Sequence, residues 1–187
     1  AIWDARIQRL FLVRDRLGIK PLYYHSSDEG IIFGSEIKAI LASGQVTKKI
    51  DYHSLNQFIW YGNTTGVRSI YKNIRKVKPG SYLTISRNNM NANRYWKIED
   101  VKSIKDNVQV GVQTIKTLLE DSVKSHLISD VPIGVFLSGG IDSSAITAFA
   151  SKHYQGKLKT YSVGFDFQNG VNELTKARKI ANHFNTD

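Results

Sequence analysis

A short segment, residues 138–144, holds the residue types best suited to chemistry in this chain. It combines three serines, two adjacent glycines and one carboxylate: Ser138, Gly139, Gly140, Asp142, Ser143 and Ser144. The apolar run 131–137 precedes the segment and a helix-like pattern follows it, which predicts a buried strand, a tight loop and a helix N-terminus. The first backbone N–H groups of a helix lack internal partners and lie at the positive end of its dipole, where phosphate binds. The glycines let the main chain approach an anion closely, and the serines add hydroxyl donors.

Asp142 differs from its neighbours, because a carboxylate repels phosphate unless a divalent cation lies between them. We therefore expect Asp142 to carry Mg²⁺ beside bound phosphates. A simpler interpretation is a strand-to-helix turn in which the serines only cap the helix. The two glycines, the acid and the three serines within seven residues favour the anion site. The loop is not a Walker loop, because the pattern GxxxxGK followed by Ser or Thr is absent.

The elements around this loop alternate between helix and strand. The sequence predicts a helix over 112–128, the strand before the loop, a helix from Ser143 or Ser144 to about Tyr154, a strand over 158–165 and a helix over 172–184. This alternation predicts a parallel sheet with right-handed crossovers. Ligands bind at the carboxyl ends of such strands. The phosphate loop lies at one of these ends, and residues 164–170 lie at the next.

The first half of the chain has the pattern of a β-rich domain with two short helices. It predicts a hairpin over 2–13, strands near 23–24 and 31–34, and a further pair over 81–86 and 95–96 joined by an Asn-rich turn at 87–93. Ser35 and Asp51 are placed to cap the two helices, which Gly44 and Gly62 end. Arg14 and Asp15 adjoin a Gly/Pro turn, and we expect a local ion pair there.

The composition is that of a globular chain with a basic surface. It is 41% hydrophobic but has no run of about eighteen apolar residues, so we expect no membrane span. It has no cysteine, which excludes disulfides and thiolate nucleophiles and suits a reducing cytoplasm, where we expect the protein. The five histidines are isolated, without metal-ligand spacing. The net charge of +10 raises the question of nucleic acid, but the basic residues are spread out; a solvated surface that attracts a polyanionic nucleotide explains the charge, and we expect no nucleic-acid partner.

Two groups of motifs carry a resemblance to a known family. SGGIDSS (138–144) resembles the pyrophosphate-binding loop of the ATP pyrophosphatases, which split ATP between its α- and β-phosphates. RDRLGIKPLYY (14–24) and FGSEIKAIL (33–41) resemble the later part of the class II glutamine amidotransferase domain. With KVKPGSYL (76–83), EDSVKSHLISDVPIGVFLSGGIDSS (120–144) and NELTKARKIANHF (172–184), the whole chain resembles the middle of a glutamine-hydrolysing asparagine synthetase.

The resemblance implies an α/β fold in two partial domains of an internal fragment. Residues 1–97 would form the C-terminal half of an α/β/β/α class II amidotransferase sandwich, and 98–107 a linker. Residues 108–187 would begin a parallel-sheet ATP-pyrophosphatase domain of the adenine nucleotide α-hydrolase type. The family's glutaminase nucleophile is a cysteine at the processed N-terminus, so no glutaminase catalytic residue is assigned in this cysteine-free chain.

The implied activity is ATP-dependent synthesis of asparagine from aspartate, with glutamine as the nitrogen donor. ATP would convert the aspartate side chain to β-aspartyl-AMP, and ammonia would displace AMP. The loop serines and glycines would hold pyrophosphate, and Asp142 would hold Mg²⁺. The resemblance further implies adenosine contacts from the main chain around Phe136 and Leu137 and from Val163, although their apolar side chains are equally typical of strand core.

Other functions stay open. A related amidotransferase could adenylate a different carboxyl group, as in β-lactam or surface-polysaccharide pathways, and the chain could be an inactive nucleotide-binding fragment. A tRNA-thiolating enzyme is disfavoured, because it would not need RDRLGIKPLYY ahead of the loop. The acceptor and the oligomeric state are not fixed by the sequence, and a homo-oligomer is compatible with it.

Overall fold

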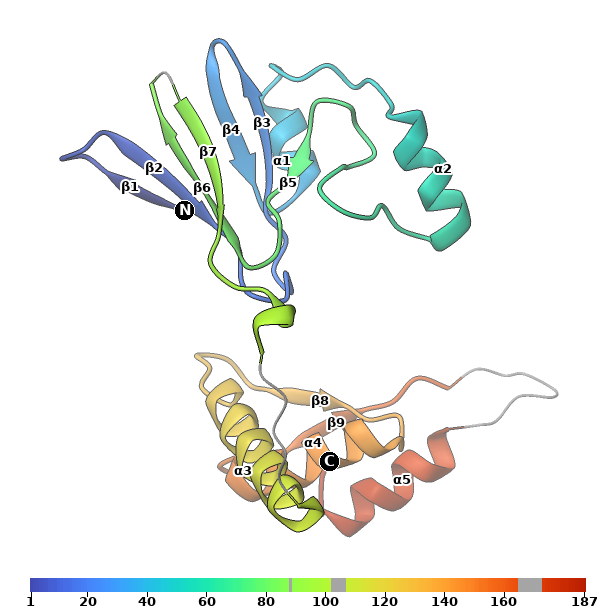
Figure 1. Cartoon of the computed structure of the whole chain (residues 1–187). Helices are drawn as coiled ribbons and strands as arrows, with labels where there is room; N and C mark the ends of the chain where they lie inside the picture. The colour runs from blue at the N-terminus through green and yellow to red at the C-terminus, as the bar shows by residue number, and fades with distance from the viewer. Residues whose placement is uncertain (88, 102–106, 165–172) are drawn as a thin grey trace. The chain divides into compact units, whose positions relative to one another are not determined.

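The computed structural model describes residues 1–87, 89–101, 107–164 and 173–187. The chain divides into two compact units, Ala1–Ser103 and Ile104–Asp187 (Figure 1). The predicted linker 98–107 contains a short 3-10 helix, Ile98–Asp100. No helix in the described ranges is both long and apolar enough to cross a membrane.

In its described residues, the first unit has two antiparallel sheets and two α-helices, besides the short 3-10 helix at its end. One sheet has the strand order β1-β2-β6-β7, and the other has the order β4-β3-β5. The elements are β1 (Ile2–Asp4), β2 (Arg9–Val13), β3 (Tyr23–Ser27), β4 (Gly30–Gly34), α1 (Ile37–Ala42), α2 (Tyr52–Tyr61), β5 (Arg75–Lys76), β6 (Ser81–Ser86) and β7 (Asn89–Arg94). The predicted hairpin at the start of the chain is confirmed, with Ile2 opposite Phe11.

Two apolar clusters define the layers of this unit. Between the sheets, buried Leu12 and Leu83 of the four-stranded sheet pack with Tyr24 and Ile31 of the three-stranded sheet. On the other face of the three-stranded sheet, Ile40 of α1 packs into a second cluster. Sheet, sheet and helix therefore follow one another, which confirms the predicted α/β class and fits three layers of an α/β/β/α sandwich.

Two local expectations in this unit are wrong. The Asn-rich segment predicted as a turn is largely strand β7, whose six residues pair with β6 from Ser81↔Arg94 to Ser86↔Asn89. Cross-strand pairing overrides the low strand propensity of asparagine there. Ser35 does not cap α1, because the helix begins one residue later and its N-cap, Glu36, makes no side-chain capping bond.

Asp51 does cap α2 as expected. Its carboxylate accepts hydrogen bonds from the backbone N–H groups of His53 (3.0 Å) and Ser54 (3.2 Å). Gly62 ends the helix with φ of 70°, a left-handed conformation that favours glycine.

The turn at Arg14 and Asp15 is held by main-chain contacts, so the expected ion pair is wrong. The guanidinium of Arg14 donates to the carbonyl oxygens of Gly18 (2.8 Å), Lys20 (3.0 Å) and Val77 (2.8 Å). Asp15 accepts from the N–H groups of Ile19 and Lys20, both at 2.9 Å. The hydrogen bond from the N–H of Lys20 contributes most, and that of Ile19 next, to lowering the pKa of Asp15. Each side chain binds the loop backbone and not its neighbour.

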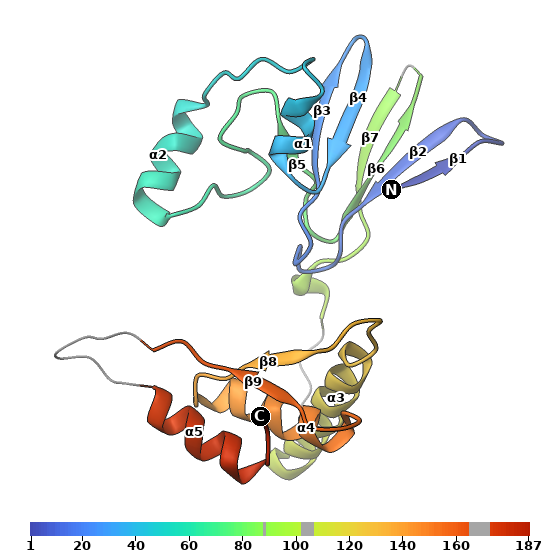
Figure 2. The same ribbon diagram turned by 180° about the vertical axis from the view of Figure 1, so that it is seen from behind.

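The second unit is a two-stranded parallel sheet with its helices on one face (Figures 1 and 2). Strand β8 pairs with β9 in a register that sets Phe136 opposite Tyr161. The elements are α3 (Val108–His126), β8 (Gly134–Phe136), α4 (Ile141–His153), β9 (Lys159–Tyr161) and α5 (Leu174–His183). The predicted parallel pairing and element order are confirmed. The strands are shorter than predicted, and residues 165–172, to which a strand end and a helix start were assigned, lie outside the described ranges.

Alternation along β8 separates a covered face from an open one. Val135 packs with Val123 of α3 and Ala150 of α4, and Leu137 packs with Ala177 and Ala181 of α5. On the other face, the side chains of Phe136, Tyr161 and Val163 are 80%, 53% and 65% exposed. All three described helices of this unit thus support the same side of the strands.

The predicted apolar stripe of α3 is covered only along its C-terminal half. Val123 is buried, with Leu119 and Leu127 packed against its cluster. Val112, Ile115 and Leu118, which lie on the same stripe one to three turns earlier, are exposed. The helix starts at Val108, four residues before the predicted start, capped by the side chain of Asn107.

Candidate nucleotide site

The predicted phosphate loop lies at the carboxyl end of β8, where the chain turns into α4. Leu137 closes the strand, since its N–H donates to the carbonyl oxygen of Tyr161 (2.8 Å) and its own carbonyl accepts from the hydroxyl of Ser162 (2.5 Å). Helix α4 begins at Ile141 with Gly140 as its N-cap residue, not at Ser143 or Ser144 as predicted. Asp142 and Ser143 therefore belong to the first helical turn. The glycine pair lies between an anchored strand and a helix of 13 residues.

A row of backbone N–H groups in this loop has no acceptor among the described residues. The N–H groups that form hydrogen bonds mark its limits: Leu137 bonds to Tyr161, Gly140 weakly to the Ser138 hydroxyl (3.4 Å), and Ser144 to Gly140. Those between them without a described partner belong to Ser138, Gly139, Ile141, Asp142 and Ser143. Ser138, Gly140 and Asp142 are exposed. Unpaired, accessible donors at the positive end of a helix dipole are the arrangement that an anion requires.

The serine hydroxyls divide into a pair that holds the loop and one that is unengaged. The oxygens of Ser138 and Ser143 lie 3.0 Å apart, and the Ser143 hydroxyl donates to the carbonyl of Gly140 (3.2 Å). Since each hydroxyl carries one hydrogen, Ser138 donates to Ser143 in this arrangement. The hydroxyl of Ser144 has no hydrogen-bond partner among the described residues. Ser144 is thus the serine whose hydroxyl needs no rearrangement to donate to a ligand.

The two glycines have different structural reasons to be glycine. Gly139 has φ of +78°, and a Cβ built on it would lie 2.6 Å from Cβ of Lys176 and 2.8 Å from the backbone nitrogen of Ala177, both in α5. A Cβ on Gly140 would meet only the Ser138 hydroxyl, at 3.4 Å. Both glycines were expected from the sequence to let the main chain approach phosphate closely. Gly139 is required by the packing of α5, and only Gly140 has its Cβ direction open.

Asp142 is placed to meet a cation that accompanies phosphate. It is exposed in the first turn of α4, beside the unpaired N–H groups. No group of three or more His, Cys, Asp or Glu side chains that could hold a metal occurs in the described part of the chain. A magnesium ion here would be held by Asp142 together with phosphate oxygens and water, the coordination that nucleotide-bound Mg²⁺ usually has. The residues present fit such a shared ion, and Asp142 as its ligand stays a prediction.

The predicted adenosine contacts lie at the end of the same sheet but have unlike surroundings. Leu137 is 1% exposed, and its N–H and C=O groups bond to Tyr161 and Ser162. Phe136 and Val163 lie on the open face, and the ring of Phe136 is 6.4 Å from that of Tyr161 at an interplanar angle of 56°. The sequence did not lead us to Tyr161, whose exposed ring lies beside that of Phe136 on this face. Its signal was available, because in a parallel pair a residue at the end of the second strand lies beside the end of the first.

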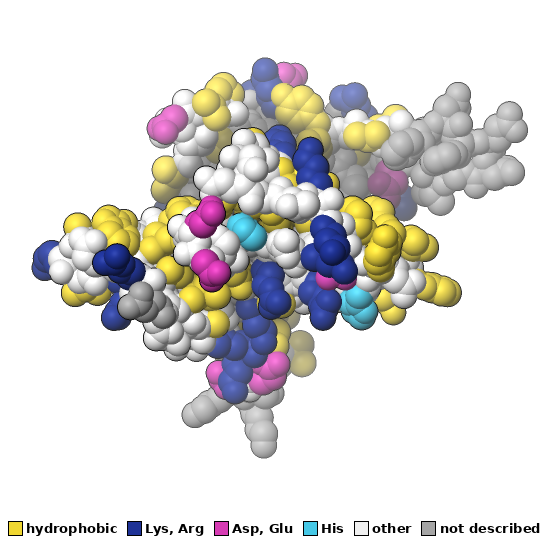
Figure 3. Space-filling view, turned by 90° about the horizontal axis from the view of Figure 1, so that it is seen from above, with side chains coloured by type: hydrophobic (Ala, Val, Ile, Leu, Met, Phe, Trp, Pro, Cys, Tyr) yellow, Lys and Arg dark blue, Asp and Glu magenta, His cyan; other side chains and the backbone are white. Residues whose placement is uncertain are grey.

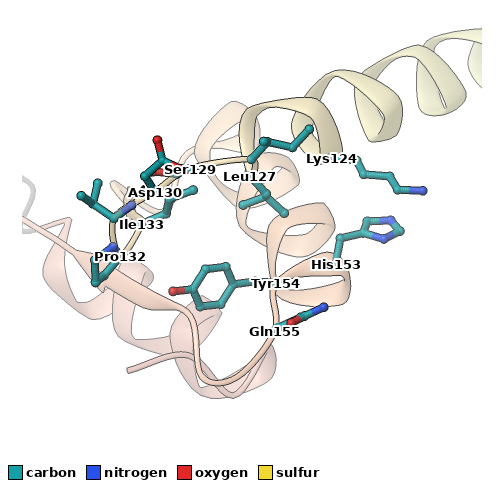
Figure 4. A pocket seen from close by; sticks show the side chains of 11 residues that line it. Lys124, Leu127, Ser129, Asp130, Pro132, Ile133, His153, Tyr154 and Gln155 are labelled. Atoms are coloured by element: carbon teal, nitrogen blue, oxygen red, sulfur yellow. Dashed lines mark hydrogen bonds between the residues drawn. The ribbon is translucent and has the colours of Figure 1, made fainter.

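A cavity of the second unit lies away from this loop, at the amino end of β8 (Figure 4). It has a volume of about 490 Å³, and its wall combines the C-terminal end of α3, the segment before β8 and the end of α4. Tyr154 extends across it toward Pro132, and Lys124 and Asp130 lie at its rim (Figure 4).

An ion cluster beside that cavity ties α3 to α4. The carboxylate of Glu120 accepts from Nζ of Lys152 (2.5 Å) and from Nε2 of His153 (2.7 Å). The hydrogen bond from Lys152, then that from His153, lower the pKa of Glu120 from 4.5 to about 2. Two other histidines bond to backbone carbonyls: His25 to Asn73 (2.7 Å) and His126 to Ser122 (2.8 Å). These contacts give all three a packing role.

Comparison with known proteins gives a consistent result for both units. The glutamine amidotransferase domain family matches residues 1–96, and the asparagine synthase family matches residues 114–187. Glutamine-hydrolysing asparagine synthetase 3 of Bacillus subtilis is 41% identical over 171 residues, which are 89% of this chain and 28% of the relative. Asparagine synthetase 1 of the same organism is 36% identical over 96% of the chain and 28% of the relative. Amidase chyE of Penicillium rubens is 35% identical over the whole chain and 30% of the relative.

The chain thus spans less than a third of the length of these three relatives. The two matched segments follow one another in the chain, and each falls within one compact unit. The unit with the exposed N–H groups is the one that matches the asparagine synthase family.

Proposed function

This chain belongs to the glutamine-hydrolysing asparagine synthetase family, and on this premise we propose that it is part of an ATP-dependent ligase that forms asparagine from aspartate with nitrogen from glutamine. The first unit would belong to the glutaminase part and the second to the synthetase part. No glutaminase nucleophile is assigned, because the chain has no cysteine.

The proposed role of the second unit is to bind ATP and hold the pyrophosphate that leaves. A carboxylate is a poor electrophile, and transfer of AMP to the aspartate side chain makes it reactive toward ammonia. The chain's contribution is positioning and charge neutralisation. The N–H groups of Ser138, Gly139, Ile141 and Asp142 and the Ser144 hydroxyl would donate to phosphate oxygens. Bound Mg²⁺ would neutralise phosphate charge, and Asp142 would hold it in place.

One observation carries this proposal: the row of unpaired, accessible N–H groups at the start of α4. A turn that only caps a helix would use serine oxygens to satisfy these donors. Here no side chain caps α4, and the Ser138 and Ser143 hydroxyls bond mainly to each other and to the loop carbonyl. The donors are therefore left for a ligand.

The test replaces Gly140 and Asp142 in the intact enzyme. Gly140→Val should abolish ATP binding by filling the space in front of the donors. The fold should tolerate this change, because a Cβ at Gly140 meets only the Ser138 hydroxyl. Asp142→Asn should abolish Mg²⁺-dependent exchange of pyrophosphate into ATP while circular dichroism and the thermal midpoint stay unchanged. Asp130→Asn, an exposed acid of the same unit outside the loop, is the matched control and should keep full exchange. Retained exchange in both loop variants would refute the assignment.

A second function differs only in the acceptor. The fungal amidases among the relatives are 35% and 32% identical over the whole chain, which supports adenylation of another carboxyl group as the alternative. Pyrophosphate exchange that depends on aspartate favours asparagine synthesis, and exchange that ignores aspartate but responds to another carboxylic acid favours the alternative. Calorimetric titration of the chain with ATP and Mg²⁺ tests nucleotide binding alone. An inactive nucleotide-binding fragment would bind ATP in this titration but would catalyse no pyrophosphate exchange with any carboxylic acid.

A further inference from the structure

The positive charge of this protein belongs almost entirely to the first unit. Residues 1–103 carry 17 Lys and Arg against eight Asp and Glu, whereas residues 104–187 carry nine against eight. A solvated surface and attraction for a nucleotide were the expected reasons for the charge, and the unit that holds the loop carries little of the excess. A ligand of the first unit itself would be a further reason for such an excess, beside a solvated surface.

Part of that charge surrounds two pockets that share Tyr24 as a lining residue. The first pocket, of about 240 Å³, is lined by Tyr24, Ser26, Lys72, Asn73, Arg75 and Met90. The second, of about 290 Å³, has Tyr24, Lys76, Lys78, Ser81 and Arg94 among its lining residues. Neither lining contains an acidic residue. In Figure 3, Lys and Arg side chains gather in a band across this unit.

The cations of these pockets are largely uncompensated. The side chains of Lys72, Arg75 and Lys78 have no ion pair or hydrogen bond to any described residue. Lys76 donates only to the backbone carbonyl of Thr64. Its burial and the nearby charge of Arg14 lower its pKa, as expected where positive groups crowd without a counter-charge. Arg94 alone has an acid nearby, Glu99 at 3.6 Å.

The backbone fixes this crowding. Ile74 and Val77 are each 1% exposed and anchor the segment in two apolar clusters. The basic residues between and beside them are left at the surface, and Arg75 and Lys76 are consecutive residues of β5 that line different pockets. This short strand therefore contributes one cation to the lining of each pocket.

We propose that these two pockets together bind a small phosphorylated molecule with two anionic groups, one group in each pocket. Arginine and lysine donors together suit phosphate oxygens, the guanidinium as a two-pronged donor and the ammonium as a point charge. The concave shape favours a small ligand over a long polyanion, which needs a continuous basic track. This site lies in the amidotransferase unit and does not depend on the function proposed for the loop.

Inorganic pyrophosphate without Mg²⁺ is the probe, and amide chemical shifts of the whole chain are the readout. Pyrophosphate should shift the amide signals of Tyr24 and residues 72–78, separately from any response of residues 138–144. Lys72→Gln and Lys78→Gln, one from each pocket, should each weaken the response of the first unit about tenfold, as expected for loss of one charged hydrogen bond. The response of the loop should not change.

Lys38→Gln is the matched control, since Lys38 is paired with Glu36 on α1 and lines neither pocket. It should leave pyrophosphate binding unchanged; equal weakening would mean a diffuse field instead of a site and would overturn the proposal. Shifts confined to residues 138–144 would overturn it as well. Orthophosphate binding as tightly as pyrophosphate would refute the two-group ligand, and binding of single-stranded RNA without any pyrophosphate response would replace the small ligand by a polynucleotide.

Discussion

At the scale of single residues, the loop of the second unit contains two glycines with different steric surroundings. Gly139 is confined by the backbone of α5 and by its positive φ, whereas Gly140 borders open space. Sequence spacing treats them alike, because the contact with Lys176 and Ala177 joins distant parts of the chain. Only the packed structure separates a glycine needed for folding from one available to a ligand.

Gly139→Ala should therefore destabilise the second unit by about 2 kcal/mol or more, from left-handed strain and overlap with a helix backbone that cannot move aside. Gly140→Ala should cost less than about 1 kcal/mol, the usual difference between these residues at an N-cap. Urea denaturation followed by circular dichroism measures both. Equal effects of the two substitutions would contradict the account of Gly139.

Arg14 is the second residue whose role required the structure. Its guanidinium joins three carbonyl groups from two segments of the first unit. Arg14→Lys keeps the charge but loses the planar fork, so it should lower the free energy of unfolding by about 2 kcal/mol. Arg16→Lys, at an exposed neighbouring position, should change it by less than about 0.5 kcal/mol. Chemical denaturation of the two variants in parallel measures both changes in the free energy of unfolding. An Arg14→Lys variant as stable as the parent chain would show that water can replace the hydrogen bonds of the guanidinium.

At the scale of elements, α3 and α4 are joined by one titratable contact. Folding lowers the pKa of Glu120 from 4.5 to about 2. A carboxyl group with a depressed folded pKa stabilises the fold above its unfolded pKa and loses that contribution as the pH falls through the folded value. The contribution of Glu120 is therefore complete above about pH 4.5 and is lost as the pH falls toward about 2.

Glu120→Gln should flatten the acid limb of the stability curve. Urea midpoints measured from pH 7 down to pH 3 should fall less steeply in this variant than in the parent chain, although the variant starts from a lower value at pH 7. Asp121→Asn, an adjacent exposed acid without an ion pair in the described structure, should follow the parent curve. If Glu120→Gln also follows it, the contact does not stabilise the helix pair.

Element types were largely predictable, and element ends were not. The strand–loop–helix order around the glycines followed from their punctuation of an apolar run, and Asp51 was found as a cap because its carboxylate acts locally. The same capping rule gave the wrong residue at Ser35, since nothing in the local sequence shows that α1 starts one residue further on. Strand β7 was missed because its pairing partner, β6, and not its own composition, makes it a strand.

At the scale of the whole molecule, the two units differ in character. The first is basic and layered, and the second is nearly neutral, with the three helices of its described residues on one side of a small parallel sheet. This charge separation can be read from the sequence by counting the acidic and basic residues of each half separately. What the sequence could not supply was the convergence of Lys72, Arg75, Lys76 and Lys78 around Tyr24, because that depends on how β5 pairs with β3.

The packing of Gly139 against α5 affects the order in which the parts of the loop can fold during synthesis. The loop emerges from the ribosome well before Lys176 and Ala177, so the strand and the start of α4 can form while the turn between them still lacks its support. Only when α5 docks does the glycine find the neighbours that restrain it. A nascent chain would therefore acquire the restrained turn only after α5 has been made.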